Sequence, residues 1–154
     1  MKVVIALGSN LGDREENIES AVIELNKIIT ITHLSTFYET EPVGGPDQPD
    51  YLNAVLIGES ELVPEELLDE ALEIESGLGR VRDIRFGPRT IDIDLIVAGD
   101  VRSDTPKLQL PHPRAHERAF VLEPWLEIEP DAHIPGRGSV ASLLALLAQN
   151  DQDE

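Results

Sequence analysis

A length of 154 residues predicts one domain with one core over residues 1–154, and an apolar content of 41% excludes a disordered chain. The absence of Cys excludes disulfides, zinc–thiolate sites and thiol nucleophiles, and no apolar run is long enough to cross a bilayer. With 30 acidic and 12 basic residues, the net charge of −18 argues against general binding to nucleic acid or to an anionic membrane. The first residues show no signal-peptide pattern, so we expect a cytoplasmic protein.

Short apolar runs that end at turn residues predict strands, and apolar residues at helical spacing behind a cap or a proline predict helices. The expected strands cover residues 2–7, 33–40, 51–58 and 90–98. The expected helices run from Asp13 to Ile29, from Pro64 to Gly77 or Gly79, from the turn at 111–113 to a stop at Pro124, and over 139–148. Residues 42–50 and 80–90 are expected to be loops, and residues 149–154 a frayed acidic tail.

The order of these elements is strand, helix, two strands, helix, strand and a helical end. A direct step from one strand to the next favours an α+β fold over a doubly wound parallel sheet. We therefore expect a ferredoxin-like α/β sandwich, with a mainly antiparallel sheet and helices packed on it.

Two carboxylates on the strand 90–98 give the clearest chemical signal. On a strand, residues i and i+2 point to the same face, so Asp92 and Asp94 lie side by side. Ile91, Ile93 and Leu95 then point to the core. Close like charges repel unless a cation lies between them, and Mg²⁺ binds a few carboxylates together with phosphate oxygens. The alternative is a solvent-facing polar stripe, since D-x-D alone is a common pattern.

Four of the nine arginines lie in the loop before that strand: Arg80, Arg82, Arg85 and Arg89. Guanidinium groups match the geometry of phosphate oxygens. Carboxylates for Mg²⁺ and arginines for phosphates together indicate phosphoryl transfer. The alternative is that these arginines pair with the many surface acids of the chain.

Glu75 continues the apolar stripe of its helix at helical spacing, so we expect a partly buried carboxylate that needs a partner. Arg80 or Arg82 is the nearest candidate in sequence. The alternative is an apolar stripe that ends one turn earlier.

Other residues have a structural and a functional interpretation. The Gly-rich turn 8–12 could bind an anion, but a turn that braces neighbouring loops is the preferred interpretation because no Walker motif is present. Tyr51 and Asn53 share one face of a strand, and an Asn amide suits the edge of a heterocycle. Phe120 could stack on a flat ring, and His112, between two prolines, could be aimed at a ligand. For Tyr51, Asn53 and Phe120 taken singly, core packing is the preferred interpretation.

These segments together resemble the 6-hydroxymethyl-7,8-dihydropterin pyrophosphokinase family. The most specific part is the run Gly-Pro-Arg-Thr-Ile-Asp-Ile-Asp-Leu at 87–95. The other matching segments are 6–12, 37–40, 47–54, 111–113 and 118–120. The resemblance implies a ferredoxin-like fold and the transfer of diphosphate from ATP to the pterin hydroxymethyl group, which leaves AMP.

The resemblance also implies a role for individual residues. Asp92 and Asp94 would hold two Mg²⁺ ions between the ATP phosphates, and Arg80 and Arg89 would stabilise the moving group. The residues expected around the pterin are Thr40, Val43, Tyr51, Asn53 and Phe120. The residues expected around ATP are Glu75, Arg82, Arg85, Arg89, Leu95, Lys107, Gln109, His112 and Arg118. The partners would be these two small molecules, and we expect a monomer.

Two other hypotheses remain open at the level of the residues. One is a different Mg²⁺-dependent enzyme, such as a nucleotide hydrolase, which would break down ATP without a pterin. The other is a non-catalytic acidic binding module, whose Asp pair binds a structural cation. The motif around Tyr51 and Asn53 favours the pyrophosphokinase hypothesis over both.

Overall fold

The structure, a computed structural model, describes residues 1–41, 48–79 and 90–152. Its centre is a five-stranded antiparallel sheet in the order β2-β4-β1-β5, with the short β3 paired to the start of β4. The strands are β1 (Lys2–Ser9), β2 (Thr30–Leu34), β3 (Tyr38–Thr40), β4 (Tyr51–Glu59) and β5 (Asp92–Ala98). The predicted α+β sandwich with a mainly antiparallel sheet is therefore confirmed.

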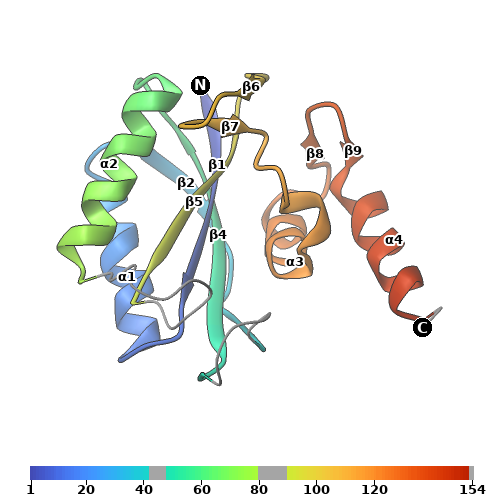
Figure 1. Ribbon diagram of the computed structural model, residues 1–154, viewed down its shortest axis with the longest axis horizontal. Helices are drawn as coiled ribbons and strands as arrows, with labels where there is room; N and C mark the ends of the chain where they lie inside the picture. Colours follow the sequence, from blue (N-terminus) through green and yellow to red (C-terminus); the bar gives the residue numbers. More distant parts are fainter. Residues whose placement is uncertain (42–47, 80–89, 153–154) are drawn as a thin grey trace.

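Helices cover both faces of the sheet. On one face lie α1 (Arg14–Leu25) and α2 (Pro64–Gly77), and on the other lies α3 (Ala119–Ile128), with α4 (Val140–Gln152) outside it (Figure 1). The remaining elements are the hairpin of β6 (Ser103–Asp104) and β7 (Gln109–Leu110), the 3₁₀ turn η1 (Ala115–Glu117), and the hairpin of β8 (His133–Ile134) and β9 (Gly138–Ser139). None of the helices in the described ranges is long and apolar enough to cross a membrane.

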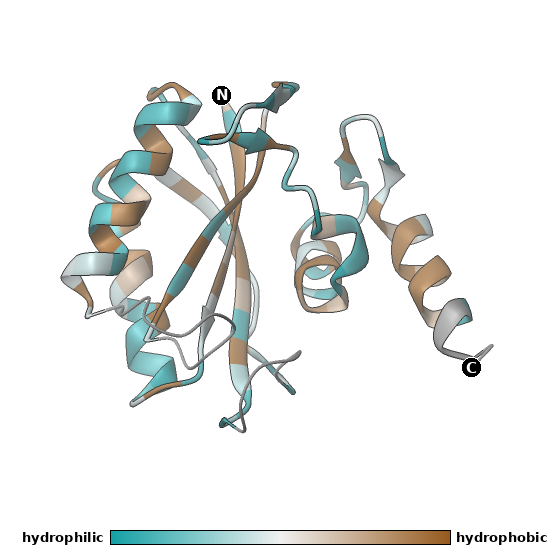
Figure 2. Cartoon of the chain, viewed as in Figure 1, coloured by the Kyte–Doolittle hydropathy of each residue, from teal (hydrophilic) through white to brown (hydrophobic). Residues whose placement is uncertain are grey.

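The alternation of side chains along the strands divides the core in two. On β1, Val3 and Ile5 belong to the cluster under α1 and α2, whereas Val4 and Ala6 belong to the cluster under α3 and α4. Both clusters are apolar because a strand places successive side chains on opposite faces, and here both faces are covered. In Figure 2, α2 accordingly carries alternating hydrophobic and hydrophilic bands.

The predicted helix starts are confirmed where a capping residue or a proline marks them. The side chain of Asp13 accepts a hydrogen bond from the backbone N–H of Glu16 (3.1 Å) at the start of α1, and Pro64 is the first residue of α2. The predicted end of the first helix at Ile29 is wrong. The helix ends at Leu25, and the backbone N–H of Ile29 still donates to the Leu25 carbonyl (3.0 Å) in the turn that follows.

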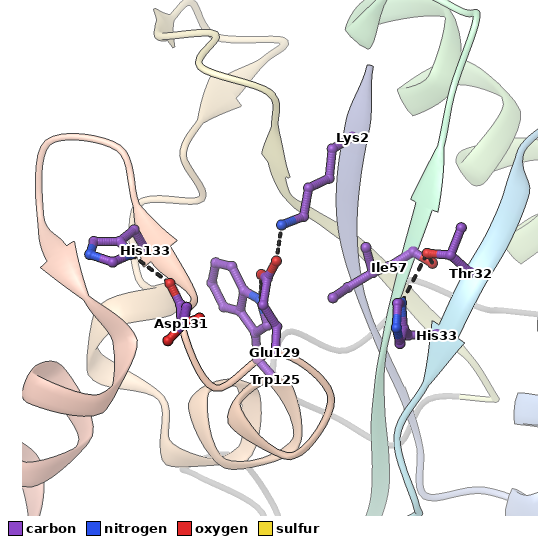
Figure 3. Close-up of polar contacts among 8 residues, drawn as sticks. All are labelled: Lys2, Thr32, His33, Ile57, Trp125, Glu129, Asp131 and His133. Atoms are coloured by element: carbon purple, nitrogen blue, oxygen red, sulfur yellow. Dashed lines mark hydrogen bonds and ion pairs between the residues drawn. The ribbon is translucent and has the colours of Figure 1, made fainter.

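The prediction that Pro124 ends a short helix is also wrong, because Pro124 lies inside α3. A proline there removes one helical hydrogen bond. The next residue, Trp125, is 1% exposed and is buried in the cluster between α3 and the sheet. The free energy gained by this burial compensates for the lost hydrogen bond. The Trp125 indole donates to the Glu129 carboxylate (2.8 Å), which also pairs with Lys2 at the start of β1 (Figure 3).

The predicted strand 33–40 is divided into β2 and β3 by Ser35. The backbone of Ser35 donates to the Val55 carbonyl (2.9 Å), and its buried hydroxyl accepts from the Val55 backbone N–H (2.9 Å). This side-chain bond replaces a backbone ladder bond and turns the chain between the two strands. At the other end of the protein, α4 continues through residues 149–152, so the predicted frayed tail is helical in that part.

Candidate active site

A cleft of about 600 Å³ opens on the α3 face of the sheet, where β1 ends and β4 and β5 begin. Three neighbouring strands supply its floor, and the segment that leads into α3 supplies its wall. The residues that line it are Ala6, Leu7, Gly8, Thr40, Glu41, Gln48, Tyr51, Asn53, Asp92, Asp94, His112, Arg114, Glu117, Arg118, Ala119 and Phe120. The cleft therefore contains most of the described residues that the sequence proposed for a substrate.

The two aspartates lie in this cleft as the spacing predicted. Asp92 and Asp94 line it and are half-buried, while Ile93 between them is buried in the core under α1 and α2. Their partners across the ladder are Gly8 and Ala6 on β1. Because these partners carry little or no side chain, space remains above the strand next to the two carboxylates.

Glu75 fixes the strand that carries the aspartates. It is 3% exposed, and its Oε2 accepts a hydrogen bond from the backbone N–H of Ile93 (2.7 Å). This N–H lies on the edge of β5 that no other described strand pairs with, so the carboxylate satisfies an edge donor between Asp92 and Asp94. The expectation of a buried carboxylate with a partner is confirmed. The partner candidates Arg80 and Arg82 lie outside the described residues.

Residues proposed for the heterocycle gather on the β4 side of the cleft, across β1 from the aspartates. Asn53 is 5% exposed, and its amide donates to the Thr40 hydroxyl (2.5 Å) on the neighbouring strand β3. Tyr51 lies two residues earlier on the same face of β4, and Phe120 reaches the cleft from the first turn of α3. A buried amide beside two aromatic rings suits a flat, polar heterocycle. Val43, proposed for the same pocket, lies outside the described residues.

The segment before α3 adds positive charge. The Arg118 guanidinium carbon lies 5.6 Å from the centroid of the Phe120 ring, which is a cation–π distance. Burial, followed by the charges of Arg118 and Arg114, lowers the pKa of His112 to about 4. The Nδ1 atom of His112 accepts from the backbone N–H of Arg114 (3.2 Å), so the neutral ring carries its proton on Nε2. His112, which lines the cleft, therefore has an N–H donor on Nε2 near neutral pH.

Several predicted nucleotide residues lie apart from this cleft. Lys107 pairs with Asp69 on α2 (3.0 Å), and Leu95 is buried in the core. Gln109 lines a second cavity of about 570 Å³ between the two small hairpins, and His112 lines both cavities. Four arginines predicted to bind ATP phosphates lie outside the described residues, namely Arg80, Arg82, Arg85 and Arg89.

The structural interpretation of the Gly-rich turn is confirmed, but the sequence analysis missed part of its role. The Asn10 amide donates to the Gln48 side chain (2.7 Å) and to the Pro49 carbonyl (3.0 Å), which braces the loop before β4 as predicted. Gly8, however, lines the cleft itself. Arg114 was also missed, and its spacing of four residues from Arg118 was the available signal.

The carboxylates of Asp92 and Asp94 are the part of the cleft that fits magnesium. No three His, Cys, Asp or Glu side chains gather as a metal cluster in the part of the chain that the structure describes. Asp92 and Asp94 offer carboxylate oxygens from one face of the same strand. Mg²⁺ binds through one or two carboxylates and completes its shell with phosphate oxygens and water, so the pair suits a metal that arrives with a nucleotide.

Comparisons with known proteins agree on one family. A profile described as 7,8-dihydro-6-hydroxymethylpterin-pyrophosphokinase (HPPK) matches residues 4–130. The 2-amino-4-hydroxy-6-hydroxymethyldihydropteridine pyrophosphokinase of Bacillus subtilis (strain 168) is 46% identical over 126 residues, which cover 80% of this chain and 75% of the relative. The Pseudomonas aeruginosa protein with the same name is 38% identical over 146 residues, which cover 94% of this chain and 90% of the relative.

Solved structures show the same fold. The Plasmodium falciparum HPPK-DHPS structure with pteroate matches with a TM-score of 0.77 and 14% identity, over 99% of this chain and 43% of that chain. An HPPK-DHPS structure in complex with substrates matches with a TM-score of 0.75 and 11% identity, over 99% of this chain and 44% of that chain. This chain therefore spans less than half the length of these solved chains, and at this identity the likeness shows the fold alone.

The sequence relatives, rather than the sandwich fold, place the chain among the pyrophosphokinases. The chain belongs to the 7,8-dihydro-6-hydroxymethylpterin-pyrophosphokinase family. The family resemblance and the ferredoxin-like fold predicted from the sequence are both confirmed.

Proposed function

We propose that this protein transfers diphosphate from ATP to the hydroxymethyl group of 6-hydroxymethyl-7,8-dihydropterin, which gives AMP and the pterin diphosphate in folate biosynthesis. Family membership supports the reaction. The main structural support is the shared cleft, in which Asp92 and Asp94 face the same space as Asn53 and Phe120. A carboxylate pair beside a heterocycle pocket is the arrangement that a phosphoryl transfer to a heterocyclic alcohol needs.

The pterin binds in this proposal at the end of the cleft nearest β3 and β4. The Asn53 amide forms hydrogen bonds with the polar edge of the heterocycle, while Phe120 and Tyr51 contact its faces. Thr40 holds the Asn53 amide in place and, with Val43, offers backbone groups. Because Asn53 is almost fully buried, a ring that leaves its amide unpaired binds weakly, which gives selectivity for the substrate.

The nucleotide binds in this proposal beside the aspartates and the segment before α3. Arg118 and His112 donate to phosphate oxygens, and Glu75 keeps the aspartate strand in place. Further contacts to the nucleotide are assigned to Leu95, Lys107 and Gln109, and to the loop residues Arg80, Arg82, Arg85 and Arg89. Among the loop residues, Arg80 and Arg89 are assigned to the transferred group itself.

The reaction is an in-line attack by the pterin hydroxymethyl oxygen on the β-phosphorus of ATP, with AMP as the leaving group. Asp92 and Asp94 are assigned as ligands of two Mg²⁺ ions, which when bound would neutralise phosphate charge. The protein orients the hydroxymethyl oxygen through Asn53 and Phe120 and supplies positive charge through Arg118. Positioning and charge stabilisation account for most of the rate acceleration in this class of reaction.

The decisive experiment mixes the protein with ATP, MgCl₂ and 6-hydroxymethyl-7,8-dihydropterin and measures AMP and the pterin diphosphate by chromatography. We expect equal amounts of the two products. The Asp94→Ala variant should fold and lose at least about a hundredfold in turnover, since it removes a carboxylate that organises the phosphates. The matched control is Asp100→Ala, which removes an exposed carboxylate beyond the far end of the same strand.

Normal turnover by Asp94→Ala would refute the assignment of the aspartate pair. ATP breakdown at the same rate without the pterin would instead favour a nucleotide hydrolase. Omission of Mg²⁺ tests the metal requirement, and we expect no product without a divalent cation. A folded protein that binds Mg²⁺ but forms no AMP under any condition would support a binding module.

We further propose that the protein acts as a cytoplasmic monomer with one domain. Both core clusters pack on the same sheet, which supports one folding unit. Light scattering on a gel-filtration peak tests the monomer, for which we expect the mass of one chain of 16.9 kDa.

A further inference from the structure

The carboxylate of Glu127 joins two elements that are far apart in the sequence. It lies near the end of α3 and accepts hydrogen bonds from three groups just before or within β3. The donors are the backbone N–H of Thr36 (2.9 Å), the hydroxyl of Thr36 (2.6 Å) and the hydroxyl of Tyr38 (2.7 Å). Three donors on one carboxylate fix the position of both partners more strongly than a single surface hydrogen bond.

This contact lies in line with the heterocycle end of the cleft. Phe120 and Glu127 are seven residues apart on α3, so they lie on the same face of the helix and roughly 10 Å apart along it. Tyr38 and Thr40 are two residues apart on β3 and share one face of the strand. The helix and the strand thus run past each other with Glu127 and Tyr38 at one end, and Phe120 and Thr40 at the other.

The strand β3 needs such support. It is three residues long and pairs with β4 alone among the described strands. A strand of this length forms few ladder bonds, so its distance from α3 depends on side-chain contacts. The same strand carries Thr40, whose hydroxyl accepts from the buried amide of Asn53 (2.5 Å). A shift of β3 therefore moves the hydrogen-bond partner of the residue assigned to the pterin edge.

We propose that Glu127 is a positioning residue for the pterin, because it sets the spacing between the two walls of the heterocycle pocket. One wall is Phe120 on α3, and the other is the pair of Thr40 and Asn53 on β3 and β4. This inference rests on the proposed function. Glu127 does not touch the substrate in this scheme. The aspartates lie on β5, and Arg118 caps the opposite end of α3 from Glu127, so the nucleotide residues do not depend on the position of β3.

The test compares the Michaelis constants of Glu127→Ala for the two substrates. We expect the KM for the pterin to rise about five- to tenfold while the KM for ATP changes less than about twofold, because one pocket wall moves and the nucleotide end does not. Glu127→Gln should fall between the wild type and Glu127→Ala, since its amide oxygen can still accept. The matched control is Glu123→Ala, one turn earlier on α3, which removes an exposed carboxylate of the same charge.

A milder variant tests the same contact if Glu127→Ala folds poorly. Tyr38→Phe removes one hydroxyl and leaves both bonds from Thr36 in place. It should raise the KM for the pterin by about twofold to threefold, and its effect should disappear in the Glu127→Ala background because both changes break the same contact. Loss of folded enzyme alone would lower the apparent kcat without separating the two KM values.

The outcomes are distinguishable. If the wild type forms no pterin diphosphate, the proposed function fails and this inference fails with it. If the wild type is active but Glu127→Ala matches Glu123→Ala, or changes both KM values equally, the inference alone is overturned.

Discussion

His112 combines a half-buried ring, two neighbouring arginines and a fixed tautomer. Burial and the charges of Arg118 and Arg114 lower its pKa from 6.5 to about 4, so the ring is neutral near pH 7. A neutral ring that donates through Nε2 adds no charge to a site that already has two guanidinium groups. The His112 ring can therefore donate to a phosphate oxygen, and its protonation state does not change with pH in the range where most enzymes are assayed.

The lowered pKa of His112 makes the stability of the protein depend on pH. Because the pKa of His112 is lower in the folded protein, the unfolded chain takes up this proton first as the pH falls. The contribution of His112 is therefore absent above about pH 6.5 and becomes increasingly destabilising down to about pH 4, below which it is constant. Its size is at most about 3 kcal/mol, and solvent around the half-buried ring reduces it.

Urea unfolding of the wild type and of His112→Gln between pH 4 and pH 7.5 measures this contribution. The wild type should lose more free energy of unfolding than the variant between pH 6.5 and pH 4, and carboxylates that titrate in the same range cancel in the difference. Parallel pH profiles for the two proteins would show that the ring titrates normally in the folded state.

At the scale of the elements, the end of β1 controls the shape of the heterocycle pocket. Gly8 lies opposite Asn53 in the ladder, and a Cβ atom at Gly8 would lie 3.1 Å from the Asn53 side-chain oxygen. The same atom would lie 3.5 Å from the Tyr51 ring. A glycine is therefore needed at this position because it leaves room for the buried amide, and not because its backbone has a positive φ.

The Gly8→Ala variant should fold and bind the pterin more weakly. The methyl group pushes against the Asn53 amide, so we expect the KM for the pterin to rise by about tenfold, with a smaller effect on the KM for ATP. Gly77→Ala at the end of α2 is the matched control, because nothing lies within 4 Å of its Cβ position. That control should leave both KM values unchanged and should not lower the melting temperature. Equal KM values for Gly8→Ala and the wild type would contradict the assigned position of the pterin edge.

The local patterns predicted the elements well where one interaction dominates. Alternation along β5 placed Asp92 and Asp94 together, and the cap at Asp13 marked the start of α1. The patterns failed where a contact with a residue distant in the sequence determines where an element ends. Ser35 divides the predicted strand because its hydroxyl accepts from Val55, and Pro124 stays inside a helix because the residues around it are buried.

The same distinction applies to the site. The i and i+2 rule predicted that Tyr51 and Asn53 share one face, and both line the cleft. The contact between Glu127 and Tyr38 spans 89 residues and depends on how α3 lies on the sheet. Neither residue has a local pattern that pairs them, so only the packed structure reveals the contact.

At the scale of the whole molecule, the charge balance is the dominant feature. The net charge of −18 belongs to a chain with three lysines and nine arginines, and many of its acidic residues are exposed. Like charges on a compact surface repel each other, and unfolding relieves this repulsion. Salt weakens the repulsion, because the screening length falls from roughly 10 Å at 0.1 M to roughly 3 Å at 1 M.

Salt should therefore stabilise the folded protein. We expect the melting temperature to rise by at least about 4 °C between 0.05 M and 1 M NaCl, which for a domain of this size corresponds to one to two kcal/mol. A variant that neutralises three exposed carboxylates, Glu19→Gln, Glu73→Gln and Asp100→Asn, separates charge repulsion from other salt effects. At 0.05 M NaCl the variant should have a higher melting temperature than the wild type, because folding brings fewer negative charges close together. At 1 M NaCl the two should converge, since screening has already removed the repulsion. A constant difference at both concentrations would mean that the substitutions act locally, and a melting temperature that falls with salt would mean that ion pairs outweigh the excess negative charge.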